Sequence, residues 1–327
     1  MKEALYWEKL DNNKVKCNLC PNYCVLSDGQ VSTCNSRKNV SGVLIAFNYA
    51  RTVSLNMDPI EKKPLYHYYP GTRIFSLGPN SCNLHCQFCQ NYEISQEECP
   101  TKVISPEDLL DLTLRQNLDQ VAFTYTEPFT WYEYIYDCAI LLSEHKKKTV
   151  LVTNGYINPE PLKVLLPYID AMNIDLKSIR PDFYRKICKG KLEPVLETIR
   201  LSAEACHVEL TNLLIPDLND TEDEIEELVN FVADVNPSIP LHFSRYYPQW
   251  KCSQPPTPEK TLLKAYEIAS SKLKYVYLGN IQPGKYSDTY CPSCSKLLIS
   301  RGIFSASKEG MKGNKCSGCG YTIYGRF

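Results

Sequence analysis

Short β-rich runs alternate with helical patterns between residue 71 and about residue 285, and this alternation limits the fold more than any other feature of the sequence. The helical patterns open at Ser105-Pro106, Thr221 and Thr257, with residue types that are typical of helix N-termini. Regular alternation of this kind predicts an α/β fold, in which a parallel sheet with helical crossovers forms a partial (β/α)6 barrel. In such barrels the chemistry lies at the C-terminal ends of the strands. The predicted strands are 73–77, 120–126, 149–153, 171–177, 208–215 and 241–246, with a seventh run at 274–278.

Sixteen cysteines are present, and eleven of them fall into three groups at short spacing. Such spacing is typical of metal ligands and not of a disulfide framework. One group precedes the barrel and one follows it, so we expect a cysteine-rich cap over 1–70, the barrel over 71–285 and a zinc-ribbon-like domain over 286–327. The groups are Cys17, Cys20, Cys24 and Cys34; Cys82, Cys86 and Cys89; and Cys291, Cys294, Cys316 and Cys319.

The central triplet of Cys82, Cys86 and Cys89 has C-x3-C-x2-C spacing and follows the first predicted strand. Three thiolates suit a [4Fe–4S] cluster with one iron that has no protein ligand, whereas a fourth ligand closes a structural zinc site. His85 is the candidate for such a fourth ligand, but it directly precedes Cys86 in the chain. The sequence therefore favours an open, catalytic cluster.

The triplet, its place after the first strand and the aromatic Phe88 before the last cysteine resemble the radical S-adenosylmethionine (SAM) superfamily. The resemblance implies a TIM-like radical SAM barrel, with Phe88 among the residues near the cofactor. It also implies the reaction class. The open iron binds the amino and carboxylate groups of SAM, and an electron from the cluster splits SAM into methionine and a 5′-deoxyadenosyl radical. That radical abstracts hydrogen from a substrate, while the protein supplies orientation and shielding.

Further similarity lies at the end of the second predicted strand. Tyr125-Thr126-Glu127-Pro128 resembles the Gly-Gly-Glu-Pro-type motif in relatives of pyruvate formate-lyase activating enzyme. The resemblance implies that Glu127 forms a hydrogen bond with the SAM ammonium. Tyr125 and Thr126 replace the two glycines of the motif, so the backbone contact that those glycines make is not implied here.

The next two strand ends also resemble the family. Asn154 and Gly155 stand where such enzymes contact the SAM ribose, and Asp175 and Lys177 resemble an Asp-x-Lys pair near the SAM carboxylate. Strand geometry supports the pair independently, because residues two apart share a face of a strand. We expect the polar face to point into the barrel and the other face to meet the helices; the residues of that apolar face are Met172, Ile174 and Leu176.

Polar residues on two later strands point to the same region. Glu209 and Thr211 share one face, as do His242 and Ser244. A polar barrel interior fits a pocket for SAM or substrate. His242 is equally compatible with a proton donor and with an interior hydrogen-bonding residue.

The whole chain resembles a narrower family, the radical SAM member of the AmmeMemoRadiSam system. This resemblance implies Memo-like and AMMECR-like proteins as partners, but it implies no substrate. The matching stretches run from end to end: 17–21, 58–67, 86–91, 242–245 and the terminal cysteine group.

The two flanking cysteine groups differ in spacing. The N-terminal group, from Cys17 to Cys34, has four thiolates that suit either zinc or an auxiliary [4Fe–4S] cluster. The C-terminal group consists of two C-x2-C knuckles separated by 21 residues, which is a zinc-ribbon pattern.

Composition excludes several other classes. The net charge of −1 argues against a nucleic-acid-binding surface along the whole chain, and no apolar run is long enough for a membrane span. We expect a cytoplasmic enzyme that receives electrons from a donor such as ferredoxin or flavodoxin. Its substrate is a partner protein, as for an activating enzyme, or else a small molecule, lipid or nucleic acid. The alternative from another class is a zinc-rich scaffold with a degenerate barrel.

Overall fold

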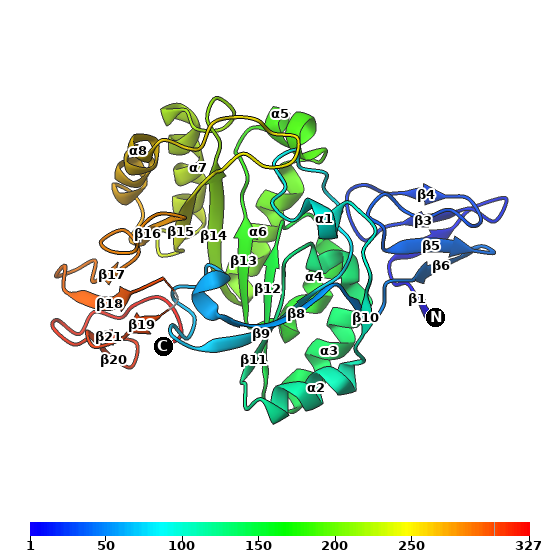
Figure 1. Ribbon diagram of the computed structural model, residues 1–327, viewed down its shortest axis with the longest axis horizontal. Helices are drawn as coiled ribbons and strands as arrows, with labels where there is room; N and C mark the ends of the chain where they lie inside the picture. Colours follow the sequence, from blue (N-terminus) through cyan, green and yellow to red (C-terminus); the bar gives the residue numbers. More distant parts are fainter. Residues whose placement is uncertain (304) are drawn as a thin grey trace.

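The computed structural model describes residues 1–303 and 305–327, and a single large sheet forms its centre (Figure 1). The strand order is β16-β15-β14-β13-β12-β11-β9-β8. All neighbours from β9 to β16 pair in parallel, whereas β8 pairs with β9 in antiparallel orientation. The strands are β8 (Ser54–Pro59), β9 (Arg73–Gly78), β11 (Gln120–Phe123), β12 (Lys148–Thr153), β13 (Ala171–Asp175), β14 (His207–Leu214), β15 (Leu241–Arg245) and β16 (Val276–Gly279).

Each crossover between the parallel strands carries a helix, so the expected α/β fold with six strand–helix units is confirmed. Ser105 caps the first long helix, because its hydroxyl accepts a hydrogen bond from Asp108 N at 3.0 Å and the Asp108 carboxylate accepts from Ser105 N. The long helices are α2 (Pro106–Arg115), α3 (Tyr132–Glu144), α4 (Pro159–Leu165), α6 (Glu193–Ala205), α7 (Glu222–Val235) and α8 (Glu259–Ser270). The short ones are η1 (Ile60–Lys62), α1 (Tyr92–Ser95), η2 (Pro128–Trp131), η3 (Leu166–Tyr168), α5 (Pro181–Phe183) and the π-helix η4 (Tyr184–Cys188).

Two strands end at least two residues earlier than the sequence predicts. Strand β11 ends at Phe123 because Tyr125 takes a left-handed backbone conformation, with φ of 70°, that turns the chain out of the sheet. Strand β13 ends at Asp175, so Lys177 lies just beyond the strand. Both differences concern the edge of the sheet where the chemistry was expected.

The core confirms the predicted faces of β13. Met172, Ile174 and Leu176 are buried in the large apolar cluster that the sheet forms with its helices. A second cluster fills the opposite, N-terminal end of the barrel, where the segment after β8 packs against the early residues of the strands. Its members are Ile60, Leu65, Tyr68, Ile74, Ala122, Val150 and Ala171.

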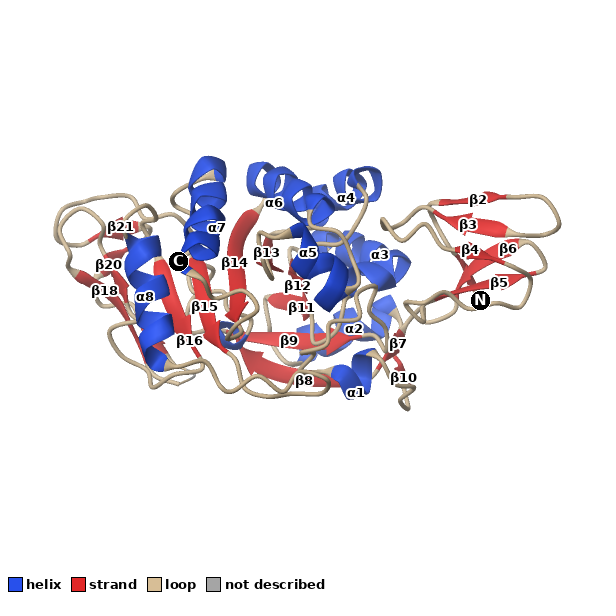
Figure 2. Ribbon diagram, turned by 90° about the horizontal axis from the view of Figure 1, so that it is seen from above, coloured by secondary structure: helices blue, strands red, loops and turns tan. Residues whose placement is uncertain are grey.

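Small sheets lie at the two ends of the molecule (Figures 1 and 2). The N-terminal ones contain β1 (Lys2–Glu3), β2 (Trp7–Lys9), β3 (Val15–Cys17), β4 (Val25–Leu26), β5 (Arg37–Val40) and β6 (Val43–Ala46), and β7 (Arg51–Thr52) pairs with β10 (Lys102–Val103). The C-terminal ones contain β17 (Thr289–Tyr290), β18 (Leu297–Arg301), β19 (Ala306–Ser307), β20 (Met311–Lys312) and β21 (Lys315–Cys316). In the part of the chain that the structure describes, no helix combines the length and apolarity that a membrane crossing requires.

Candidate functional site

A cavity of about 510 Å³ lies at the C-terminal ends of the parallel strands, where the sequence predicted the chemistry. Its wall brings together nearly all the residues expected around the cofactor. Gly155 is the exception: it does not line the cavity, and a side chain there would approach Ile174 at 3.0 Å. The predicted residues on the wall are Cys82, Cys86, Phe88, Cys89, Glu127, Asn154, Asp175 and Lys177.

The loop that carries the cysteine triplet is held from one side by the π-helix η4. The backbone amides of His85 and Gln87 donate hydrogen bonds to the carbonyls of Cys188 and Ile187, at 2.9 and 3.0 Å. The His85 ring does not line the cavity, and its Nδ1 is hydrogen bonded to Gln96 Oε1. This geometry disfavours His85 as a fourth ligand and leaves three thiols facing the cavity.

Glu127 is almost completely buried, and both of its carboxylate oxygens are engaged. Oε1 accepts hydrogen bonds from Phe129 N at 2.9 Å and Thr153 Oγ1 at 2.6 Å, and Oε2 accepts from Asn154 N at 2.7 Å. Burial raises the pKa of Glu127 to about 7, although these hydrogen bonds oppose the shift. Glu127 lines the cavity, and a cationic ligand bound there would stabilise the ionised form of its carboxyl group.

Asn154 connects this carboxylate to the cysteine triplet. Its side-chain amide donates to Asn83 Oδ1 at 2.9 Å and lies 3.7 Å from Cys82 Sγ, while its backbone amide donates to Glu127. One residue therefore fixes the relative positions of the carboxylate and the first thiol.

Asp175 and Lys177 form an ion pair of 2.9 Å in the wall of the same cavity. Burial opposes ionisation of Lys177, but the charges of Asp175 and the Cys86 thiol raise the pKa of Lys177 well above its ordinary value. Lys177 Nζ also lies 5.8 Å from the centre of the Phe88 ring. Lys177 thus stays cationic beside the triplet, on a wall that also holds Glu127.

Tyr125 adopts the backbone conformation that glycine favours, although it replaces a glycine of the related motif. Its hydroxyl donates to Asp58 Oδ2 at 2.6 Å, and the Lys63 ammonium lies 4.5 Å from the centre of its ring. Lys63 in turn pairs with Asp58 at 2.6 Å, and both Lys62 and Lys63 line the cavity. The sequence predicts no role for these two lysines, and their adjacency within the stretch 58–67 is the one signal that it carries.

Of the polar residues expected on β14 and β15, Thr211 and Ser244 line the cavity. Glu209 and His242 instead belong to a closed network, because His242 Nε2 lies 2.7 Å from Glu209 Oε2. His242 is therefore an interior hydrogen-bonding residue in this structure.

Glu209 is fully buried and holds the segment that follows β8. Its oxygens accept from the backbone amides of Tyr66 and His67 at 3.0 and 2.7 Å, and His207 Nε2 lies 3.0 Å away. Burial alone would raise the pKa of Glu209, but hydrogen bonds from His207 and His242 hold it well below its ordinary range. This network lies outside the cavity and stabilises the barrel.

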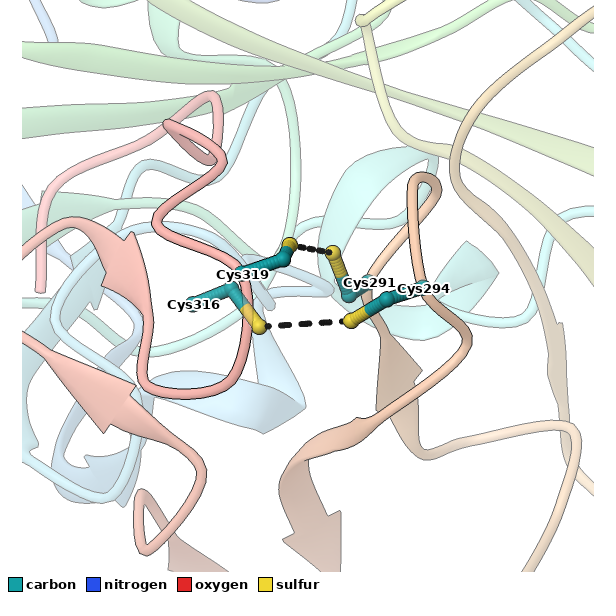
Figure 3. A group of neighbouring side chains, drawn as sticks. All are labelled: Cys291, Cys294, Cys316 and Cys319. Atoms are coloured by element: carbon teal, nitrogen blue, oxygen red, sulfur yellow. Dashed lines mark hydrogen bonds between the residues drawn. The ribbon is translucent and has the colours of Figure 1, made fainter.

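The C-terminal cysteines meet as two facing pairs (Figure 3). Cys291 Sγ lies 3.6 Å from Cys319 Sγ, and Cys294 Sγ lies 3.7 Å from Cys316 Sγ. Four thiolates about 2.3 Å from one tetrahedral zinc ion would be about 3.8 Å apart, so these sulfur atoms fit a single metal ion. Over residues 1–303 and 305–327, no other group of three or more potential ligands brings its ligand atoms within 4.8 Å of one another.

The N-terminal cysteines are also gathered, but less tightly. Cys17, Cys20 and Cys34 are buried and Cys24 is half-buried. The charges of Cys34 and Cys24 help to raise the pKa of Cys17 to about 11, after the larger effect of burial. The Cys17 amide donates to Cys24 O at 2.9 Å, which holds two of the four cysteines together, but no three of the four sulfur atoms lie within 4.8 Å of one another.

Comparisons with known proteins agree with this site. Residues 78–232 match the Radical SAM superfamily. An uncharacterized protein of Methanocaldococcus jannaschii is 44% identical to the chain and spans 99% of both proteins. A probable GTP 3′,8-cyclase of Methanosarcina mazei is 27% identical over 67% of the chain and 71% of its own length.

Among solved structures, a radical SAM methyltransferase of Sphaerobacter thermophilus superposes with a TM-score of 0.51. The match covers 64% of this chain and 67% of that one at 13% sequence identity, so it concerns the fold alone. The superfamily match covers the strand ends that line the cavity from β9 to β14, and it implies SAM and a [4Fe–4S] cluster as cofactors. Residues 78–232 therefore form a domain that is similar to the Radical SAM superfamily.

Proposed function

We propose that Cys82, Cys86 and Cys89 hold a [4Fe–4S] cluster in the cavity and that the protein cleaves SAM there reductively. When bound, these cofactors supply a 5′-deoxyadenosyl radical that abstracts hydrogen from a substrate. The observation that carries the proposal is the common cavity wall, which combines three thiols with an anionic and a cationic side chain.

The proposed binding mode follows from these charges. The ammonium of SAM pairs with Glu127, whose buried carboxylate gains a charge-assisted hydrogen bond. The carboxylate of SAM lies near Lys177, which Asp175 holds in place through their ion pair. Asn154 contacts the ribose, and Phe88 shields the cofactors from water. A scaffold with a degenerate barrel would have no need for this combination.

For the substrate we propose a partner protein, which would make the enzyme similar to an activating enzyme of glycyl-radical proteins. The end-to-end resemblance to the AmmeMemoRadiSam family supports Memo-like and AMMECR-like proteins as the partners to test. We further propose that the reaction takes place in the cytoplasm with electrons from ferredoxin or flavodoxin. In this scheme the C-terminal cysteines bind one zinc ion with a structural role.

A second candidate is a small anionic substrate. Lys62 and Lys63 place two ammonium groups at the cavity wall, and the similarity to a probable GTP 3′,8-cyclase gives a precedent for a nucleotide. Asp58 pairs with both lysines, so an anion would have to compete with an existing ion pair.

One experiment separates these candidates. The enzyme is incubated anaerobically with SAM, a reductant and either the Memo-like and AMMECR-like proteins or a mixture of nucleotides. We expect release of 5′-deoxyadenosine with a mass change in one of the proteins. Cys86→Ala should abolish this release, and Cys138→Ala, which changes a buried cysteine in α3, should not. A Cys86→Ala protein that still released 5′-deoxyadenosine at the parent's rate would contradict the proposed function.

A further inference from the structure

The two groups of four cysteines have different geometries. The C-terminal sulfur atoms lie at distances that suit one tetrahedral ion, whereas the N-terminal ones do not come within 4.8 Å of one another as a group. A cluster of several irons is larger than a single ion and holds its thiolates further apart. The N-terminal spacing therefore favours a cluster over zinc.

A buried cation stands beside the N-terminal group. Arg37 is completely buried, and its Nη2 forms an ion pair with Glu133 Oε2 at 2.9 Å while Nη1 donates to Thr130 O at 3.1 Å. Its Nε, however, is buried and has no hydrogen-bond partner among the described residues. A buried donor without an acceptor is costly, so this donor indicates that a ligand accepts from it.

Two serine hydroxyls connect Arg37 to the cysteines. The Arg37 backbone amide donates to Ser32 Oγ at 3.1 Å, and its Nη1 donates to Ser36 Oγ at 3.4 Å. Both hydroxyls lie within 3.1 Å of Cys34 Sγ. An anionic group bound by the four thiols is the acceptor that the unpaired Nε lacks.

Hydroxyl groups surround one of the sulfur atoms. Cys34 Sγ lies 3.1 Å from Ser32 Oγ and 3.0 Å from Ser36 Oγ. Hydrogen bonds to the ligand sulfurs are among the features that set the reduction potential of an iron–sulfur cluster. Structural zinc has no redox chemistry that such tuning would serve.

Two short series of contacts connect this group with Cys82 of the triplet. In the first, Asn22 Nδ2, between Cys20 and Cys24, donates to Asn83 O at 2.9 Å, and Asn83 directly follows Cys82. In the second, Arg37 donates to Thr130 O, and the Thr130 hydroxyl lies 2.6 Å from that of Ser81, which directly precedes Cys82.

We propose that Cys17, Cys20, Cys24 and Cys34 hold a second iron–sulfur cluster, to which Arg37 Nε donates a hydrogen bond, and that this cluster exchanges single electrons with the triplet site. Each transfer oxidises one cluster and reduces the other by one electron, with no bond made or broken. The Arg37 charge stabilises the reduced, more negative form of the second cluster. The electron-exchange part rests on the proposed function, whereas the identity of the metal does not.

Metal analysis of the anaerobically reconstituted full chain tests the identity of the site. We expect about eight irons and one zinc per chain. Cys20→Ala should lower the iron content to about four and leave the zinc unchanged. Cys86→Ala should remove the other four or so irons. The two variants therefore test the triplet cluster and the N-terminal cluster separately, because an error in either assignment changes the iron content of a different variant. About four irons and two zincs in the unmutated protein would overturn the proposal.

A redox titration followed by electron paramagnetic resonance tests the role of Arg37. Arg37→Met alone would leave Glu133 buried without a counter-charge, so we pair it with Glu133→Gln. Ser36→Ala provides a milder change, because it removes a single hydroxyl near Cys34. Both variants should lower the midpoint potential of the second cluster and leave that of the triplet cluster unchanged. Unchanged potentials, or equal shifts of both clusters, would refute the role of Arg37.

Discussion

Glu127→Gln tests the proposed SAM site most sharply, because the pKa of this carboxyl predicts a pH dependence. With a pKa of about 7, Glu127 is about 3% ionised at pH 5.5 and about three-quarters ionised at pH 7.5 before SAM binds. Pairing with the SAM ammonium requires the ionised form. SAM should therefore bind roughly 25-fold more weakly to the parent protein at pH 5.5 than at pH 7.5.

The variant should differ in two ways. At pH 7.5 it loses a charge-assisted hydrogen bond worth about 1.5–3 kcal/mol, so its dissociation constant for SAM should rise roughly 10- to 150-fold. Its affinity should also be nearly independent of pH between 5.5 and 7.5, because no proton has to leave residue 127. Anaerobic equilibrium dialysis with radiolabelled SAM, on protein with equal iron content, measures both effects.

Asp170→Asn is the matched control. Asp170 also accepts a backbone hydrogen bond, from Thr149 N at 2.8 Å, and burial also raises the pKa of its carboxyl, but it does not line the cavity. This variant should keep the parent's pH profile for SAM. A parent profile that is flat over this range, or a Glu127→Gln variant that retains the parent's slope, would show that Glu127 only anchors Phe129, Thr153 and Asn154.

Three further predictions concern other parts of the molecule. Glu209→Gln should lower the free energy of unfolding by about 3–5 kcal/mol at pH 7, measured by denaturant titration, because it breaks a buried charged network. The pKa of Glu209 is lower in the folded than in the unfolded protein, so ionised Glu209 stabilises the fold above pH 4.5 and ceases to do so as the pH falls below that value. The free energies of unfolding of the parent and the variant should therefore converge in acid. Two curves of unfolding free energy against pH that stay parallel would contradict this. Lys177→Met should weaken SAM binding about tenfold or more with full iron loading retained, and unchanged affinity would exclude its proposed contact. Cys294→Ala should release the zinc and lower the melting temperature while the iron content stays the same; loss of iron instead would assign these cysteines to a cluster.

Local patterns made the edge of the barrel that carries the candidate site predictable. The alternation of Met172, Asp175 and their neighbours identified the two faces of β13, since a strand has a period of two residues. The two C-x2-C knuckles likewise predicted a compact group of four thiols, and the four cysteines lie together in the structure. In each case the prediction rests on the spacing of a few residues along the chain: the two-residue period of a strand, or the repeat of a C-x2-C motif.

Contacts between distant segments were not predictable in this way. Glu209 binds the amides of Tyr66 and His67 across more than 140 sequence positions, and nothing in either segment specifies the other. Arg301 of the C-terminal region donates to Tyr66 O at 2.6 Å, so that region packs on the barrel through the same segment. The early end of β11 was not predicted, for another reason. The predicted strand 120–126 is apolar and rich in residues that favour strands, and this pattern does not indicate the left-handed conformation of Tyr125.

Because the triplet loop lies against the π-helix η4, two backbone amides can report assembly of the proposed cluster. The amides of His85 and Gln87 are protected from exchange with solvent only while the triplet loop stays against the carbonyls of Cys188 and Ile187. Deuterium uptake at these two positions should therefore rise when iron is removed, even if the rest of the barrel keeps its protection. Mass spectrometry of the corresponding peptides would then follow maturation of the enzyme without any measurement of turnover.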